Sequence, residues 1–371
     1  MPVPDLTTNR PFILESGPQL PNLRIHYRTF GTLNEAADNV IWICHALTAN
    51  ADPTEWWPGL TGEGKIFDPE HHYIVCANML GSCYGSTGPC DEDPATGKPY
   101  RLNFPLVTIR DMVRAHQLLR SHLGIRRIKL CIGGSMGGQQ ALEWAIAEPA
   151  LFDNLCLLAT NARHSPWGIA FNEAQRMALL ADPSIHTDSP EAGHAGIEAA
   201  RAIAMLSYRH YYTYKYTQLE PDNEKLDDFR ASSYQRYQGL KLRKRFDPFA
   251  YITLSKAMDS HNVGRGRPGI EEALQRVEAN TLLIGIQSDL LFPVAEQAEM
   301  ANGIPRSRLE VIESDYGHDG FLVESALIGP LIESFMQDPQ FQARSAGYKL
   351  RNGKRPARVM KGLALPGTER F

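Results

Sequence analysis

Residues 126–145 decide the fold, and they read Arg126-Arg-Ile-Lys-Leu-Cys-Ile-Gly-Gly-Ser-Met-Gly-Gly-Gln-Gln-Ala-Leu-Glu-Trp-Ala145. An apolar run ends at Gly133, and apolar residues at helical spacing follow from Ala141 onward. The stretch therefore predicts a strand, a sharp turn and a helix. Ser135 stands in the turn between two glycine pairs, so the turn matches the pattern Gly-x-Ser-x-Gly.

Such a turn holds its serine in a strained backbone conformation and lifts the hydroxyl clear of the sheet. Glycine is needed on either side because the strand and the helix pass too close for a side chain. A glycine-rich turn before a helix can instead cradle a phosphate. No Gly-Lys-Ser or Gly-Lys-Thr follows here, so the sequence favours a nucleophilic serine.

The bulk composition indicates a globular enzyme rather than a nucleic-acid or membrane protein. The 371 residues are 43% hydrophobic and 22% charged, with a formal net charge of −4. A slightly acidic chain has no general attraction for nucleic acid. The first ten residues contain no apolar core of a signal peptide, and no apolar run is long enough to span a membrane. We expect no nucleic-acid partner and no membrane contact.

Six cysteines are present, and none forms a Cys-x-x-Cys pair. Four of them lie in apolar runs, where a free thiol behaves as a small hydrophobic group. The spacing of Cys83 and Cys90 matches no common zinc pattern, although a disulfide between them is an alternative. Reduced structural thiols, no metal site and a cytoplasmic location are expected.

Short apolar runs alternate with helical patterns, which predicts an α/β fold with a mostly parallel sheet covered on both faces. The predicted strands are 40–44, 73–76, 128–132, 155–158, 281–286 and 309–312, and the predicted helices are 108–123, 138–147 and 294–302. The alternation stops between about 161 and 278, where helix formers and tyrosines prevail. We predict a core of residues 1–160 and 279–345, a helical lid insertion over 161–278, and a tail over 346–371.

The tail is basic, with eight Lys and Arg residues against one acid from Arg344 onward. A solvated and partly disordered segment is the simpler interpretation, and contact with an anionic ligand is the alternative.

A serine hydroxyl becomes a good nucleophile when a histidine accepts its proton and a carboxylate orients that histidine. In the sheets that carry this type of turn, the three groups follow in the order Ser, Asp or Glu, His, each after a strand. Ser135, Asp289 and His318 have that order. The alternatives are a helix N-cap for Asp289 and a surface-loop role for His318.

An oxyanion hole needs two backbone N–H donors. The N–H of Met136, directly after the serine, is one candidate. The N–H of Leu47, in the loop 45–50 after an early predicted strand, is the other. The alternative for this loop is a connection of no catalytic use. His45, at the end of the preceding strand, is expected to shape the loop.

With these stretches in view, the chain resembles the homoserine O-acyltransferase family of the α/β-hydrolase fold, whose best-known members are homoserine O-acetyltransferases of methionine biosynthesis. The resemblance runs from about residue 10 to about 340. It is carried by residues 45–48, 78–89, 94–100, 104–113, 133–138, 258–261, 288–293 and 316–322. Departures occur at Ala49-Asn50, at residues 51–64 and at His261-Asn262, and they affect the acyl pocket rather than the three catalytic candidates.

The resemblance implies that Arg209 and Tyr216 hold the carboxylate end of homoserine and that Asp319 pairs with its ammonium. A guanidinium suits a carboxylate, and a carboxylate balances an ammonium. A salt bridge within the insertion is the alternative for Arg209, and a histidine-orienting or solvent-facing role is the alternative for Asp319. The resemblance also implies a homodimer joined through the insertion.

The predicted reaction is transfer of an acyl group, acetyl in preference to succinyl, from acyl-CoA to L-homoserine through an acyl-serine. Acyl-CoA is a co-substrate, and no cofactor is expected. L-Serine is an alternative acceptor, because one methylene group distinguishes it from homoserine. A serine esterase or thioesterase, with water as acceptor, and a non-catalytic binding module are the alternatives from other classes.

Overall fold

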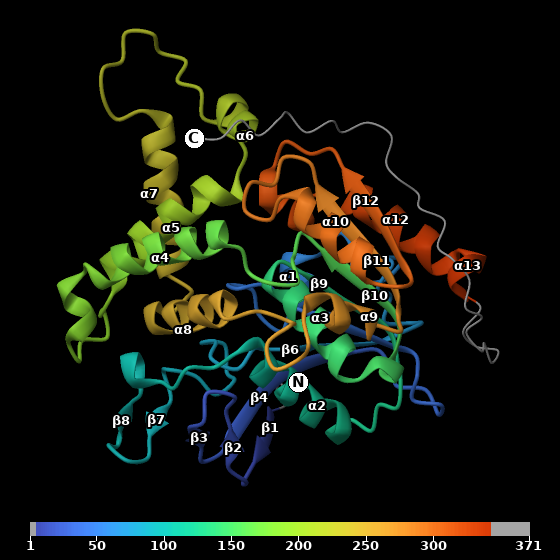
Figure 1. The fold of residues 1–371 in the computed structure, drawn as a ribbon. Coiled ribbons are helices and arrows are strands. Elements are labelled where there is room, and N and C mark those ends of the chain that lie inside the picture. The colour runs from blue at the N-terminus through green and yellow to red at the C-terminus, as the bar shows by residue number, and fades with distance from the viewer. Residues whose placement is uncertain (1–4, 343–371) are drawn as a thin grey trace.

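An eight-stranded sheet lies at the centre of the computed structural model, which describes residues 5–342 (Figure 1). The predicted basic tail, 346–371, lies outside the described residues. The strand order is β1-β4-β6-β5-β9-β10-β11-β12. The bounds are β1 Asp5–Thr8, β4 Leu23–Phe30, β5 Val40–Cys44, β6 Tyr73–Ala77, β9 Ile128–Gly134, β10 Phe152–Leu158, β11 Asn280–Ile286 and β12 Ser307–Ile312. Two small antiparallel pairs are β2 Phe12–Ile13 with β3 Gln19–Leu20, and β7 Glu92–Asp93 with β8 Lys98–Pro99.

The expectation of a mostly parallel sheet is confirmed. The six strands from β6 to β12 in the sheet order are parallel, and each contains one of the predicted runs. The antiparallel strands β1 and β4 were not predicted. In β4, buried and half-buried residues alternate over most of the strand, so it lacks the continuous apolar run of a strand buried on both faces.

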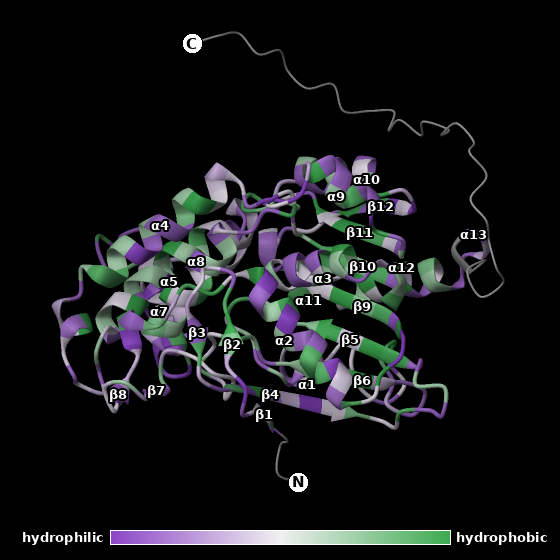
Figure 2. Ribbon diagram, turned by 60° about the horizontal axis from the view of Figure 1, so that its bottom comes forward, coloured by the Kyte–Doolittle hydropathy of each residue, from purple (hydrophilic) through white to green (hydrophobic). Residues whose placement is uncertain are grey.

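Helices cover both faces of the sheet, and alternate residues of each central strand point to different faces. In β5, Val40 and Trp42 pack into the core beneath α2 and α3, whereas Ile41 and Ile43 pack into the core that includes α12. Figure 2 shows the central strands as the most hydrophobic part of the molecule. The helices outside the insertion are α1 Pro53–Trp56, α2 Ile109–His122, α3 Met136–Ala147, α10 Val294–Gly303, α11 Gly320–Val323, α12 Ser325–Gln337 and α13 Pro339–Gln342.

Residues 161–278, hereafter the insertion, contain α-helices and no strand apart from an isolated bridge between Arg163 and Asn262. Helices α4, α5, α7 and α8 pack on one another beside the sheet (Figure 1). The bounds are α4 Pro166–Leu180, α5 His194–Tyr208, α6 Tyr211–Thr217, α7 Arg230–Arg243, α8 Pro248–Asp259 and α9 Ile270–Gln275.

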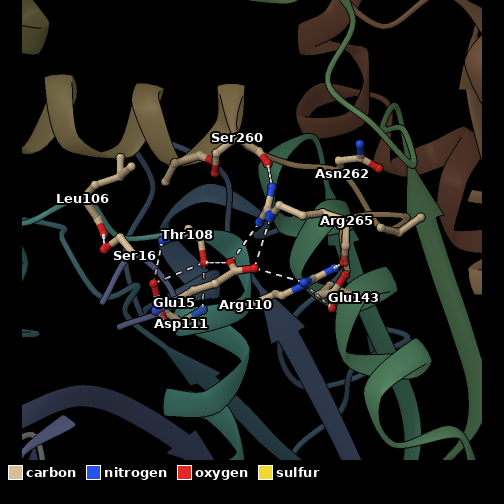
Figure 3. Close-up of polar contacts among 12 residues, drawn as sticks. Glu15, Ser16, Leu106, Thr108, Arg110, Asp111, Glu143, Ser260, Asn262 and Arg265 are labelled. Atoms are coloured by element: carbon tan, nitrogen blue, oxygen red, sulfur yellow. Dashed lines mark hydrogen bonds and ion pairs between the residues drawn. The ribbon is translucent and has the colours of Figure 1, made fainter. Parts of the chain in front are cut away.

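A cluster of charges joins the N-terminal segment to α2, α3 and the end of the insertion (Figure 3). Glu15 accepts hydrogen bonds from Arg110 at 2.9 Å and from Arg265 at 3.0 Å, and Arg110 also bonds the buried Glu143 on α3 at 3.0 Å. Burial alone would raise the pKa of Glu15. The hydrogen bonds from Arg265 and Thr108, together with the charges of Arg265 and Arg110, outweigh burial and lower it to about 2.

Candidate active site

Ser135 occupies the sharp turn between β9 and α3, with φ 55° and ψ −127°. This left-handed backbone is costly for a residue with a side chain, and such strain is typical of a functional turn. A Cβ atom on Gly133 would lie 2.3 Å from the backbone of Gly137, and one on Gly137 would lie 2.1 Å from the carbonyl oxygen of Cys44. The two flanking glycines are therefore required by close backbone contacts.

The structure brings the three catalytic candidates together, although they come from distant parts of the chain. His318 Nε2 lies 2.9 Å from Ser135 Oγ, and His318 Nδ1 lies 2.7 Å from Asp289 Oδ2. The three residues are between 3% and 7% exposed. This arrangement lets the imidazole accept the serine proton while the carboxylate stabilises the imidazolium that results.

Asp289 lies in the loop between β11 and α10 and also fixes the local backbone. Its Oδ1 accepts hydrogen bonds from the N–H groups of Leu291 and Phe292, at 2.8 and 2.9 Å. The N-cap position of α10 is occupied by Pro293, so Asp289 is not the cap of that helix. One carboxylate oxygen thus holds the loop and leaves the other for His318.

Aromatic rings surround the imidazole of His318, which lies in a 3₁₀ turn, Gly317–Asp319. The ring of Phe292 stacks on it at 5.0 Å, and the rings of Phe321 and Tyr208 lie 5.2 and 5.8 Å away. Sequence reasoning missed Tyr208, because nothing distinguishes it from the other tyrosines of the insertion. These rings exclude water from the face of the imidazole and fix its orientation.

Both oxyanion-hole candidates lie next to the serine turn. Met136 is the first residue of α3, so its N–H has no acceptor within the helix. Leu47 is 5% exposed and lies in the turn 46–49, which is closed by a bond from Ala49 N–H to Ala46 O at 3.0 Å. The contact between Gly137 and Cys44 brings the end of β5 against the start of α3.

His45 shapes the backbone before this turn, as expected. Its Nδ1 lies 2.9 Å from Ala46 O, and its Nε2 accepts the N–H of Met79 at 3.1 Å. These contacts fix the proton on Nδ1. Burial lowers the pKa of His45 to about 4, so the ring is neutral at pH 7.

The three substrate-binding candidates are only partly assembled. Arg209, at the end of α5, pairs with Asp319: Nε lies 2.9 Å from Oδ2. Arg209 Cζ also lies 5.8 Å from the centre of the Tyr316 ring. Tyr216 lies apart on α6, where it is 66% exposed and stacks on Tyr212. The structure thus joins the two charged candidates to each other.

A cavity of about 630 Å³ opens beside the loops that carry Asp289 and His318. The residues that line it include Ser288 and Tyr316 from these loops, and Tyr212 and Tyr216 of α6. This volume is within the range of small-molecule sites. Tyr216 therefore faces a space that adjoins the catalytic loops.

A group of side chains that could ligate a metal lies in another part of the chain. Among the described residues, Asp68, Glu70 and His71 place ligand atoms within 4.8 Å of one another in the loop before β6. The Asp68 carboxylate already accepts the N–H groups of Gly64 and Glu70, at 2.7 and 2.9 Å. These bonds account for the position of Asp68 without an ion.

The fold and the site together define the class: a protein of α/β-hydrolase fold with a serine placed for acyl chemistry. The model of the α/β-hydrolase fold family matches residues 39–325. A homoserine O-acetyltransferase of Cyclobacterium marinum is 50% identical over 87% of this chain and 92% of its own length. The chain belongs to the homoserine O-acetyltransferase family.

Two solved structures are similar throughout. Homoserine O-acetyltransferase from Bacillus anthracis has a TM-score of 0.84 at 25% identity and covers 91% of this chain and 98% of its own. An acetylester hydrolase from Corynebacterium glutamicum has a TM-score of 0.80 at 25% identity, over 90% of this chain and 96% of its own. Between residues 5 and 342, no helix combines the length and the apolar character needed to cross a membrane.

Proposed function

We propose that this protein transfers the acetyl group of acetyl-CoA to the γ-hydroxyl of L-homoserine, giving O-acetyl-L-homoserine and CoA. The reaction serves methionine biosynthesis in the family to which the chain belongs. One observation carries the chemistry: Ser135 Oγ, His318 and Asp289 form a continuous hydrogen-bonded chain. The 50% identity to a curated homoserine O-acetyltransferase supports the choice of substrates.

In the first half-reaction, Ser135 Oγ attacks the thioester carbon while His318 takes its proton. The N–H groups of Leu47 and Met136 stabilise the oxyanion of the tetrahedral intermediate. The C–S bond then breaks, His318 returns the proton to the departing thiolate, and an acetyl-serine remains.

In the second half-reaction, His318 removes the proton of the homoserine γ-hydroxyl, which attacks the acetyl-serine. Collapse of the intermediate breaks the bond to Ser135, and the serine recovers the proton. Arg209 binds the carboxylate of homoserine and Asp319 its ammonium, so the zwitterion replaces the ion pair that joins these residues. Tyr216, which lines the cavity, also holds the bound amino acid.

The experiment is a substrate grid of acetyl-CoA and succinyl-CoA against L-homoserine, L-serine and water, scored by kcat/KM. We expect acetyl-CoA with homoserine to exceed every other pair. CoA release at the same rate without an amino acid would instead identify a hydrolase, the activity named for the C. glutamicum neighbour. Faster reaction with serine or succinyl-CoA would identify the alternative acceptor or donor.

A mass measurement after incubation with acetyl-CoA alone tests the nucleophile. The wild type is expected to gain one acetyl group, and the Ser135→Ala variant none. Acetylation of the variant at the same level would place the nucleophile elsewhere.

The proposal includes a homodimer joined through the insertion. Large apolar side chains are exposed there, among them Leu206, Tyr211, Leu219, Leu226 and Tyr237, at 58% to 93%. Exposed apolar groups gathered on one region favour a protein interface. Light scattering should give twice the chain mass, and a monomer at micromolar concentration would contradict this part. A cytoplasmic location also belongs to the proposal, on the basis of the free cysteines, and fractionation of cells tests it.

A further inference from the structure

We infer that Arg245 is a positioning residue, through which the insertion holds the oxyanion turn, residues 46–49, in its catalytic conformation. The inference rests on the proposed function, since the turn matters for rate only if the N–H of Leu47 binds an oxyanion. Arg245 lies outside the stretches of sequence that carry the family resemblance.

Arg245 lies in the connector between α7 and α8 and reaches across to the turn. Its Nη1 donates to Thr48 O at 2.5 Å and to Tyr84 Oη at 3.0 Å, and its Nη2 lies 3.4 Å from Thr48 Oγ1. Thr48 directly follows Leu47. The guanidinium therefore holds both the carbonyl and the side chain of the residue next to the proposed oxyanion donor.

The other side-chain contacts near the turn lie at its two ends. Before Leu47, His45 Nδ1 bonds Ala46 O, and Gln140 of α3 donates to His45 O at 3.2 Å. After the turn, the indole N–H of Trp56 donates to Asn50 O at 3.1 Å. Arg245 is the side chain of the insertion that bonds Thr48, between these two ends. A turn closed by one backbone hydrogen bond has alternative peptide orientations. A guanidinium on Thr48 O selects among them and so fixes the direction of the Leu47 N–H.

The connector itself is firmly placed, so Arg245 can transmit a position. Phe246 is 4% exposed, and its ring meets that of Tyr84 edge to face at 5.6 Å. Asp247 caps α8 by accepting the N–H of Ala250 at 2.8 Å, and its own N–H lies 3.5 Å from Cys83 Sγ. Arg245 is itself exposed, but it directly precedes these packed residues, which join the insertion to the loop after β6.

A different role for an exposed arginine here is to bind a phosphate of acyl-CoA. The two roles differ in their dependence on the donor. A phosphate contact raises KM for acetyl-CoA and leaves a small neutral ester unaffected. A positioning role lowers the acylation rate with both donors, because both pass through the same oxyanion.

The test compares Arg245→Met, Arg245→Lys and the control Arg243→Met, which removes the ion pair of Arg243 with Glu198 at the end of α7. Acetylation of Ser135 is followed in the pre-steady state with acetyl-CoA and with p-nitrophenyl acetate. We expect Arg245→Met to lose about 10- to 100-fold with both donors, which is less than the loss of an oxyanion donor itself. Arg245→Lys should recover part of the rate, and Arg243→Met should match the wild type.

Two further measurements separate positioning from a general loss of structure. The inhibition constant of a trifluoromethyl ketone, which forms an oxyanion on Ser135, should rise by the same factor as the acylation rate falls. The KM for homoserine should stay within two-fold, and the thermal midpoint should match that of Arg243→Met.

Equal acylation rates in Arg245→Met and Arg243→Met would overturn the inference. A loss confined to acetyl-CoA, seen as a raised KM, would overturn it in favour of phosphate binding. Wild-type acylation that homoserine does not discharge would contradict the proposed function instead, and that result leaves the Arg245 comparison with p-nitrophenyl acetate intact.

Discussion

One carboxylate oxygen of Asp289 accepts hydrogen bonds from the backbone, and the other contacts the catalytic imidazole. A substitution that replaces only the second oxygen therefore tests the catalytic role of Asp289. In Asp289→Asn, the amide oxygen keeps the N–H groups of Leu291 and Phe292, while the amide NH₂ faces His318 Nδ1. The ring must then carry its proton on Nε2, where it cannot accept the proton of Ser135. We expect kcat to fall about 10⁴-fold, the size seen for this change in other triads.

The measurement is kcat with saturating acetyl-CoA and homoserine, beside the thermal midpoint of each variant. Asp153→Asn is the control, because Asp153 lies in β10 and pairs with Arg127 rather than with the site. A fall of less than ten-fold in Asp289→Asn would mean that the carboxylate does not set the tautomer of His318.

The sequence predicted the three catalytic candidates, but it did not predict how the substrate-binding candidates contact one another. Each of Ser135, Asp289 and His318 follows a strand-like run, so their meeting at one sheet edge follows from the strand order. The pairing of Arg209 with Asp319 depends on where α5 ends relative to the turn that carries His318. No local pattern encodes that path, so this ion pair was not predicted from the sequence. The alternative for Arg209 was a salt bridge within the insertion, and Asp319 lies outside the insertion.

The turn between β9 and α3 shows how two elements constrain each other at a single position. Gly137 lies in the first turn of α3, and a Cβ atom there would meet the carbonyl of Cys44 at 2.1 Å. In Gly137→Ala, the helix or the end of β5 must move, and either movement displaces Met136 or the oxyanion turn. We expect kcat/KM to fall at least 100-fold, with the thermal midpoint lowered by several degrees.

Gly329→Ala is the matched control, since Gly329 lies within α12 and a Cβ atom there makes an ordinary contact of 3.5 Å with Leu60. Because Gly329 precedes Pro330, whose ring disfavours a side chain at the preceding helical residue, alanine gains no helix propensity here. This variant should nevertheless be as active as the wild type, because it lies outside the serine turn. Full activity of Gly137→Ala would show that the close approach of β5 and α3 is not required.

Strand β4 marks the limit of prediction at the scale of elements. Continuous apolar runs revealed the six parallel strands. Five of these strands are largely buried on both faces, whereas β12, at the edge of the sheet, is mostly half-buried. β4 is antiparallel to both its neighbours, and its alternate residues are only half buried, so its pattern is weaker than theirs. The parallel strands that carry the site could therefore be predicted, whereas the antiparallel strands β1 and β4 at the other edge of the sheet could not.

Several histidines are buried and neutral in the folded protein, and they make its stability depend on pH. Burial lowers the pKa of His45 and of His164 to about 4, and that of His261 to about 3. In the unfolded chain these groups bind protons below about pH 6.5. The stabilisation that comes from keeping these histidines neutral is therefore complete above about pH 6.5, and it is lost as the pH falls toward 4. Glu15, with its pKa lowered to about 2, adds a second loss below pH 4.5.

We accordingly expect the free energy of unfolding to fall between pH 7.5 and pH 5, by about 2 kcal/mol for each buried histidine at most. Urea unfolding at pH 7.5, 6 and 5 measures this slope. His261→Gln keeps a donor toward Asn161 O and should remove about a third of the slope. His122→Gln, at an exposed position at the end of α2, should leave the slope unchanged. A free energy that stays constant from pH 7.5 to pH 5 would mean that these histidines are charged in the folded state, which their burial opposes.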